Sequence, residues 1–309
     1  MSKTLPVAQP AVAPVGTSAG SGIWLGIAGM LCFSLTLPAT KLAVTSVDPL
    51  IVGLGRSLVA LPFALVALLL SRGGLPPRSA MTRLPIVVAG NIFGFPVFSA
   101  LAVHYSSAAH AAVIFGTMPF ATALAGALRA RERMSPRFWL FSAAGAAVTA
   151  LFSFDSQRSG GIGLGDLYAC IAVALGSLGY AEGALLARQF GPMRVQAWAL
   201  VLGAPPVAVL VAWLAATRGV HLDLKACAGL LYIGAFSSFL GFIPWNAGLA
   251  RGGVARVGQI LLLQPICTIA WSFLLLHESV NDKTLLSAVA VCLCATLAIR
   301  ARHKASGTH

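Results

Sequence analysis

The chain has few charged residues for its length. Only 9% of its 309 residues are Asp, Glu, Lys or Arg, whereas 58% are hydrophobic, and its mean hydropathy is +0.87. A soluble domain is about one quarter charged, because its surface must be solvated by water. This shortage of charged residues excludes a soluble globular protein of this size and indicates that lipid surrounds most of the chain.

Acidic residues are especially scarce, with 8 against 21 basic ones and a net charge of +13. Nucleic-acid-binding surfaces gather Lys and Arg into patches. Here the basic residues stand singly or in small groups between long apolar runs, as in the cytoplasmic loops of membrane proteins. We therefore expect no nucleic-acid partner.

Motifs for metals, disulfides and nucleotides are also missing. The six cysteines form no CxxC pair and lie in or beside apolar segments, where Cys commonly packs as a small apolar side chain. No GxxxxGK[ST] phosphate loop occurs. We expect no metal, cofactor or ATP site. The cysteines are Cys32, Cys170, Cys227, Cys267, Cys292 and Cys294.

Long apolar runs are abundant. A helix needs about 20 apolar residues to cross the hydrocarbon layer, which predicts an all-α integral membrane protein of about ten transmembrane helices. The break from Ser106 to His110 is the least clearly marked. The expected spans are 23–43, 50–70, 85–105, 108–128, 136–154, 164–187, 195–217, 226–249, 255–277 and 283–299.

The basic residues predict the orientation of these spans. With the N-terminus in the cytoplasm, fifteen of the 21 basic residues fall in inner segments and four in outer loops. Such an excess marks the cytoplasmic side. We expect a multi-pass protein of the cell inner (plasma) membrane, with both termini cytoplasmic.

The two halves of the chain share a spaced pair of residues. Pro119 is followed by Glu132 after thirteen residues, and Pro265 by Glu278 after the same interval, at an offset of 146 residues. Five spans in each half would insert the second half upside down. Inverted repeats let many transporters open alternately to either side of a central site.

The expected segments are a disordered tail at 1–22, a first five-helix repeat at 23–154, a linker at 155–163, a second repeat at 164–300 and a cytoplasmic tail at 301–309.

The pattern from Ala102 to Ser135, with Pro119 inside it, resembles the EamA repeat of the drug/metabolite transporter superfamily. So does the stretch from Gly248 to Val280.

Asp48-Pro49 followed by Arg56, and Gly165-Asp166 opening the sixth span, also fit that family. The resemblance implies ten helices, a cavity between the halves, and often export of amino acids or other metabolites.

Two charged residues inside expected spans are candidates for substrate binding. Arg56 can receive a carboxylate bidentately, pair with Asp48, or extend to the outer surface. Glu182 lies near the cytoplasmic end of span six and is either a proton or cation site or the partner of a basic residue such as Arg188. Charges at such depth are expensive and face a cavity or a partner.

Uncharged side chains at mid-depth complete the candidate site, although many Ser, Thr and Asn side chains in lipid bond instead to neighbouring helices. The substrate-binding candidates among them are Asn91, Tyr180, Trp245, Asn246, Gln264 and Trp271, with Ser34, Ser99, Thr117 and Ser237 as further possible lining residues.

Other residues are expected at hinges, gates or the interface. Pro119 and Pro265 interrupt helices at matching places, while Glu132 and Glu278 end helices and are expected to close a gate or pair with loop arginines. Lys41 is expected at the outer interface. His104 and His110 flank the loop between spans three and four, where solvated histidines are commoner than pH sensors.

These features predict a secondary transporter that exports amino acids or related small metabolites by alternating access, as a monomer or homodimer. The alternatives are a cationic drug or polyamine antiporter, which usually needs a buried carboxylate, and a phosphate-ester carrier. A membrane enzyme is less favoured, since no HExxH helix or Ser–His spacing is present. A channel stays open as a possibility.

Overall fold

The computed structural model describes residues 19–71, 74–130, 135–156, 163–252 and 257–306, and within these ranges the regular structure is helical throughout. Eight helical stretches among the described residues are long and apolar enough to cross a membrane. They are Gly20–Ala43, Pro49–Leu70, Leu84–Tyr105, Ala108–Leu128, Leu164–Phe190, Pro192–Arg218, Leu224–Gly252 and Gly258–Leu276. The expected break at Ser106 is confirmed.

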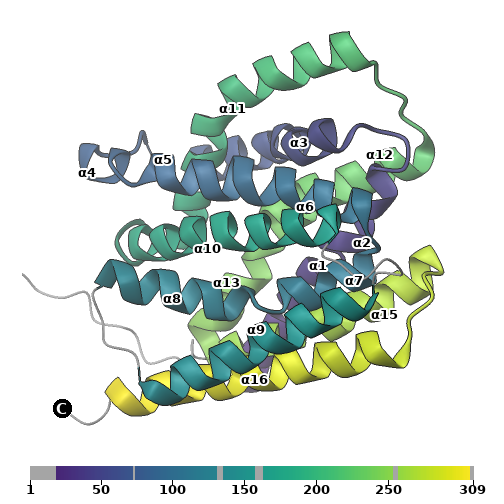
Figure 1. The fold of residues 1–309 in the computed structure, drawn as a ribbon. Coiled ribbons are helices and arrows are strands. Elements are labelled where there is room, and N and C mark those ends of the chain that lie inside the picture. The colour runs from purple at the N-terminus through teal and green to yellow at the C-terminus, as the bar shows by residue number, and fades with distance from the viewer. Residues whose placement is uncertain (1–18, 72–73, 131–134, 157–162, 253–256, 307–309) are drawn as a thin grey trace, which may run out of the picture.

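Two more long helices occupy the places of the fifth and tenth expected spans. They are α9 (Pro136–Ser156) and α16 (Asp282–Ser306), which pack side by side in the lower part of Figure 1. They are not among the eight stretches above, so ten membrane spans stays a prediction. α16 continues six residues into the expected tail 301–309, and α1 begins at Ala19, inside the expected tail 1–22.

The fourth and ninth spans are each interrupted just before a proline. Span four consists of α7 (Ala108–Phe115) and α8 (Met118–Ala130), and span nine of the 3-10 helix η3 (Gly258–Leu263) and α15 (Gln264–Leu276). Proline is tolerated in a first helical turn because the N–H there has no partner within the helix. The new helices begin at Met118 and Gln264, separated by the same 146 residues as the sequence repeat.

The third and eighth spans share another device, a π-helical segment followed closely by a proline. In span three α5 (Leu84–Val87) leads into η1 (Val88–Gly94) and α6 (Phe95–Tyr105). In span eight α12 (Leu224–Tyr232) leads into η2 (Ile233–Leu240) and α13 (Phe242–Gly252). Pro96 and Pro244 supply no N–H to the preceding turn, and a wider turn accommodates that loss.

The two halves interleave rather than form separate bodies. α1 (Ala19–Ser34) packs on α13, and α10 (Leu164–Phe190) packs on α6, so the first span of each half packs on the third span of the other half. α3 (Pro49–Leu70) packs on α11 (Pro192–Arg218), at the top of Figure 1. The remaining helices are α2 (Thr36–Ala43) and α4 (Arg78–Met81).

Glycine permits the closest helix contacts. A Cβ on Gly90 would lie 2.5 Å from the Leu175 carbonyl oxygen, and one on Gly248 would lie 2.6 Å from the Gly26 nitrogen. Small residues let transmembrane helices approach in this way. Gly90 and Gly94 are spaced as in a GxxxG motif, and both face Leu175.

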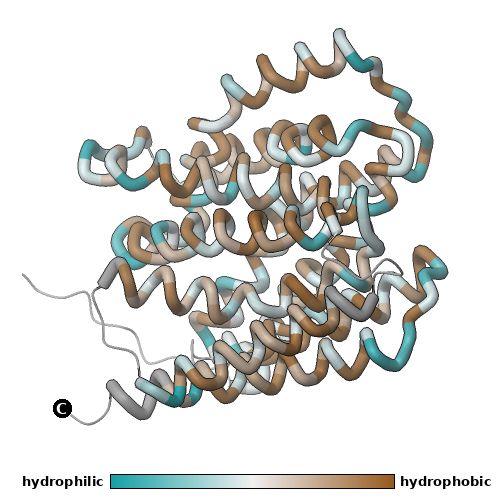
Figure 2. Tube along the Cα trace, viewed as in Figure 1, coloured by the Kyte–Doolittle hydropathy of each residue, from teal (hydrophilic) through white to brown (hydrophobic). Residues whose placement is uncertain are grey.

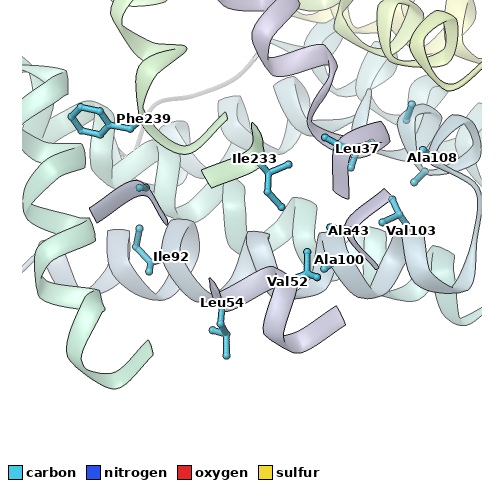
Figure 3. Packing of buried hydrophobic residues seen from close by; sticks show 14 of the residues in the cluster. Leu37, Ala43, Val52, Leu54, Ile92, Ala100, Val103, Ala108, Ile233 and Phe239 are labelled. Atoms are coloured by element: carbon cyan, nitrogen blue, oxygen red, sulfur yellow. The ribbon is translucent and has the colours of Figure 1, made fainter. Parts of the chain in front are cut away.

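Buried side chains are mostly small or branched, as Figure 3 shows for Val52, Ala100, Ile233 and their neighbours. Many Leu, Trp and Phe side chains are instead exposed along the helices, whose hydropathy is drawn in Figure 2. Lipid tails are as apolar as Leu. The exposed apolar surface is therefore the surface of a membrane protein.

Candidate functional site

The first span is broken at its centre, where α1 ends at Ser34 and α2 begins at Thr36. Side chains of α15, in the second half, bond to this break. The Trp271 indole N–H donates to the Ser34 hydroxyl at 3.0 Å, and the Thr268 hydroxyl donates to the Ser34 carbonyl at 2.8 Å. The Gln264 amide lies 3.5 Å from the Phe33 carbonyl. The candidate site therefore begins where the two halves meet.

Arg56 joins this site from α3 and is only 4% exposed. Its Nε donates to Ser238 Oγ at 2.9 Å, and its Nη2 donates to Ser237 Oγ at 2.9 Å and to the Ile233 carbonyl at 3.3 Å. Ser237 also bonds to Thr36 at 2.6 Å, which connects the guanidinium to the broken span. Nη1 is buried and has no hydrogen-bond partner among the described residues.

The charge of Arg56 is uncompensated within the described part of the chain, where no carboxylate lies at ion-pair distance from it. Asp48, one of its expected partners, instead binds Arg218 at 2.6 Å. The burial of Arg56 also excludes the expected alternative in which it extends to the outer surface. An ion without a counter-ion in a low-dielectric interior costs several kcal/mol, so the arrangement suits an anionic ligand.

Aromatic side chains lie near this centre. Tyr180 of α10 is close enough to Arg56 for the two groups to interact electrostatically. Phe33 contacts Phe242 and Trp245, with ring centroids 4.8 and 6.2 Å apart respectively.

The two candidate asparagines, Asn246 and Asn91, differ in their contacts. Asn246 reaches Met193 Sδ at 3.5 Å. Asn91 Oδ1, on η1, is buried without a partner among the described residues, and it lies 2.3 Å from where a Cβ on Gly179 would stand.

Glu182 is 1% exposed and lies 4.0 Å from Nε of Arg83, whose side chain is 44% exposed. The pair lies at the end of the bundle that the charge distribution predicts to be cytoplasmic. Of the two expected roles, the geometry favours the partner of a basic residue. Arg83 is one such residue, whereas the sequence suggested Arg188.

Glu278 connects the halves at the opposite end. His277 ends α15 in the left-handed conformation (φ 52°), which histidine adopts more readily than most residues. This turn aims the Glu278 carboxylate at the start of α7, where its two oxygens accept the N–H groups of Ala108 and Ala109, both at 2.9 Å. Glu132, its counterpart in the repeat, lies outside the described residues.

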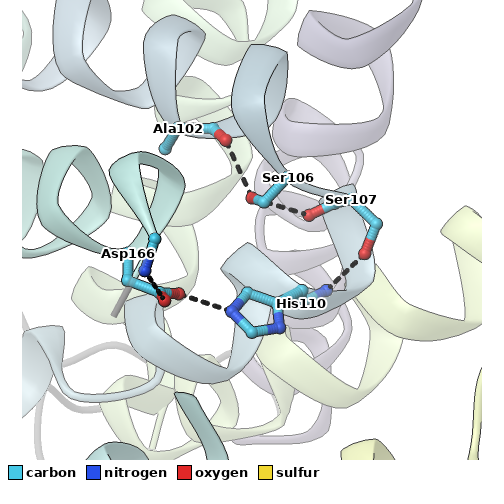
Figure 4. Close-up of polar contacts among 6 residues, drawn as sticks. Ala102, Ser106, Ser107, His110 and Asp166 are labelled. Atoms are coloured by element: carbon cyan, nitrogen blue, oxygen red, sulfur yellow. Dashed lines mark hydrogen bonds and ion pairs between the residues drawn. The ribbon is translucent and has the colours of Figure 1, made fainter. Parts of the chain in front are cut away.

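A histidine–carboxylate pair is the feature that sequence reasoning missed. His110 Nε2 lies 2.5 Å from Asp166 Oδ1, with side-chain exposures of 13% and 2% (Figure 4). The expectation of a solvated loop histidine is therefore wrong for His110 but correct for the exposed His104. Lys41 lies nearby, donating to the carbonyls of Val103 and Ser106 at 2.6 and 2.8 Å.

Among the surface pockets formed by the described residues are two of about 390 Å³, one beside Asp48, His104 and Arg218 and one between η3 and α16. Neither is lined by Arg56. Arg56 itself is buried, and the central cavity implied by the family resemblance stays a prediction.

The sequence matches the EamA-like transporter family twice, at residues 20–154 and 163–300. The chain belongs to this family. The resemblance inferred from the matched prolines and glutamates is confirmed, and with it a membrane-embedded transporter.

Similar proteins agree with this assignment. The chain is 40% identical over 278 residues to the uncharacterized transporter YdeK of Bacillus subtilis, covering 90% of this chain and 96% of the relative. It is 24% identical over 285 residues to an uncharacterized transporter of Archaeoglobus fulgidus, covering 90% and 99%. A crystal structure at 19% identity and a TM-score of 0.61, covering 94% of this chain and all of the other, shows the same fold.

Proposed function

We propose that this EamA-like transporter exports amino acids or related small carboxylates across the inner membrane, and that Arg56 binds the carboxylate. The observation that carries the proposal is a buried guanidinium with neutral partners only and one unused nitrogen. Arginine binds carboxylates through two parallel hydrogen bonds. A substrate carboxylate would supply both the missing charge and the missing acceptor.

Transport by alternating access is supported by the matched interruptions of spans four and nine and of spans three and eight. Broken helices between inverted repeats commonly carry the substrate site and the rocking motion of secondary transporters. Arg56 contacts η2, so movement of one half against the other would remodel the site. Pro119 and Pro265 are the proposed hinges.

The other substrate classes are less well supported. A cationic drug or polyamine needs a buried carboxylate, but Glu182 is near Arg83 and Asp166 is bonded to His110. A phosphate ester would favour a second cation, yet the Lys41 ammonium donates to two backbone carbonyls. A single cation at the site suits a carboxylate.

The test is efflux from proteoliposomes loaded with a panel of radiolabelled amino acids, with and without a pH gradient. Wild type and Arg188→Gln, which removes an exposed arginine, should show saturable flux. Arg56→Gln should lower kcat/KM about 100-fold, because one partner of a buried charged pair is lost. Arg56→Lys should retain part of the activity. Absence of flux for every amino acid and small carboxylate would overturn the substrate class.

A further inference from the structure

The corner between α6 and α7, residues 103–110, is held by side chains from three other elements. Lys41 of α2 donates to the carbonyls of Val103 and Ser106. Glu278, beyond α15, accepts from the first two amides of α7. Asp166 of α10 bonds to the His110 imidazole, as Figure 4 shows. The corner is therefore fixed mainly by polar contacts.

Two of these contacts join the first half of the chain to the second, since Glu278 and Asp166 both belong to the second half. They lie at the end of the bundle that the basic residues predict to be the outer face. Because the halves interleave, opening to one side requires helices of one half to move past helices of the other. Outward opening that separates α7 from α10 and from the end of α15 breaks or stretches both contacts.

His110 is the member of this set whose side-chain type titrates near neutral pH, between about pH 5 and 8. The imidazole has little room, because it stacks on Phe152 with ring centroids 4.8 Å apart while Asp166 faces Nε2. The other Asp166 oxygen accepts the Gly163 N–H at 3.0 Å. This carboxylate is therefore held in place to receive a charged imidazole.

The other ionisable groups near this corner, on the elements packed against α7, are Lys41 on α2, His104 and Tyr105 on α6, Tyr168 and Cys170 on α10, His277 and Glu278 after α15, and Asp282 and Lys283 on α16. Asp155 and Arg158, at and beyond the end of α9, have side chains outside the described residues. Among the described groups, Asp166 is the one in direct hydrogen-bond contact with the His110 ring.

We propose that His110 and Asp166 form a proton-binding latch on the outer face of the transporter. Protonation of His110 turns its hydrogen bond to the Asp166 carboxylate into an ion pair between opposite charges, which strengthens the contact. The protonated imidazole therefore holds the corner closed more strongly than the neutral one does. By linkage, acid pH at the outer face favours closure, and that support is lost as pH rises.

The latch is expected at one face only. The residue 146 positions after His110 is Arg256, and arginine stays charged throughout the range in which imidazoles titrate. No acidic residue precedes Asp48 in the sequence, so the first half offers no counterpart of Asp166 at the start of its first span. The inner face should therefore not respond to pH in the same way.

The test is hydrogen–deuterium exchange of the α7 amides in lipid nanodiscs without substrate, at about pH 5.5 and about pH 7.5, corrected for intrinsic exchange. In wild type, protection of residues 108–115 should fall about tenfold from the lower to the higher pH. Asp166→Asn, whose amide oxygen can still accept from Gly163, should show weak protection at both. His110→Gln, which stays neutral, should also show weak protection at both.

His104→Gln is the matched control and should behave as wild type, because His104 is exposed at the same end of the bundle. Wild-type protection that does not change with pH, or an unaltered pH response in Asp166→Asn, would overturn the latch. The proposal rests on the alternating-access part of the proposed function but not on its substrate. Arg56→Gln should keep the pH response even if carboxylates prove not to be substrates, so the two failures are distinguishable.

Discussion

The two π-helical segments have the same backbone form but different chemistry. η1 and η2 lie at matching places in the two halves, and the 146-residue offset pairs Asn91 with Ser237 and Ile92 with Ser238. On η2 both serines bind Arg56. On η1 Ile92 is buried against α11, 2.9 Å from where a Cβ on Gly203 would stand.

This comparison distinguishes the features that movement requires from those that substrate recognition requires. Both halves have the wide turn, the nearby proline and the interrupted helix, which are the features that a rocking motion requires. The charged group is present on one side of the repeat only, because the residue 146 positions after Arg56 is Leu202. A substrate bound at Arg56 would therefore be recognised by polar groups of one π-helix and not the other.

The sharpest test of this asymmetry compares the two π-helices directly. Replacing Ser237 and Ser238 together by alanine removes two hydrogen bonds from the guanidinium and should raise KM about tenfold or more, since bonds to charged groups contribute about 1.5–3 kcal/mol each. Asn91→Ala, in the matching segment, should leave KM unchanged. Concentration-dependent efflux measures both, and equal effects of the two changes would contradict the asymmetry.

A second prediction concerns packing beside η1. A Cβ at Gly179 would stand 2.3 Å from Asn91 Oδ1, whereas one at Gly183 meets only Val87 at 3.8 Å. Gly179→Ala should therefore destabilise the protein by about 1–3 kcal/mol through overpacking, while Gly183→Ala is tolerated. Thermal unfolding in detergent measures the difference, and it should shrink when Gly179→Ala is combined with Asn91→Ala. Equal stability of the two single variants would count against the close contact.

A third prediction concerns the contact between halves at the outer corner. Glu278→Gln removes the charge that accepts the Ala108 and Ala109 amides and should cost about 1–2 kcal/mol. Amide exchange at the start of α7 should accelerate about tenfold at both acid and neutral pH, because Glu278 is not the proposed titrating group. Asp282→Asn, an exposed change nearby, is the control. Unchanged exchange in Glu278→Gln would refute its capping role.

The smallest effect is expected at Glu182. Its contact with the half-exposed Arg83 is long, at 4.0 Å, and Arg56, not Glu182, is the proposed substrate-binding charge. Glu182→Gln should keep saturable flux within about twofold of wild type and should keep any dependence on a pH gradient. Loss of that dependence would place proton coupling at Glu182 and favour the cation antiporter.

Local chemistry explains which features the sequence could predict. The interruptions at Pro119 and Pro265 were predictable, because proline cannot continue a helix without losing a hydrogen bond. The π-helices were not, since no residue type requires that conformation and the neighbouring prolines indicate only some irregularity. The apolar runs predicted the helices, and Ser106 marked a break that the structure confirms.

The candidate site was predictable only in its isolated members. Arg56 was recognisable as a charge inside a span, but its partners lie 181 and 182 residues away. The pairing of His110 with Asp166, 56 residues apart, depends on how α7 packs against α10. The available signal was that His110 and Asp166 each lie in the first turn of an expected span. Residues at such positions are more commonly solvated beside a loop than paired with each other.

The most direct test of the central claim, that Arg56 recognises a carboxylate, is competition by matched ligands in reconstituted efflux. Each transported amino acid is compared with its carboxamide, which keeps the side chain and amine but lacks the negative charge. The account predicts that the acid competes about 100-fold better than the amide in wild type, and that this preference disappears in Arg56→Gln. Equal competition by acid and amide in the wild-type protein would contradict it.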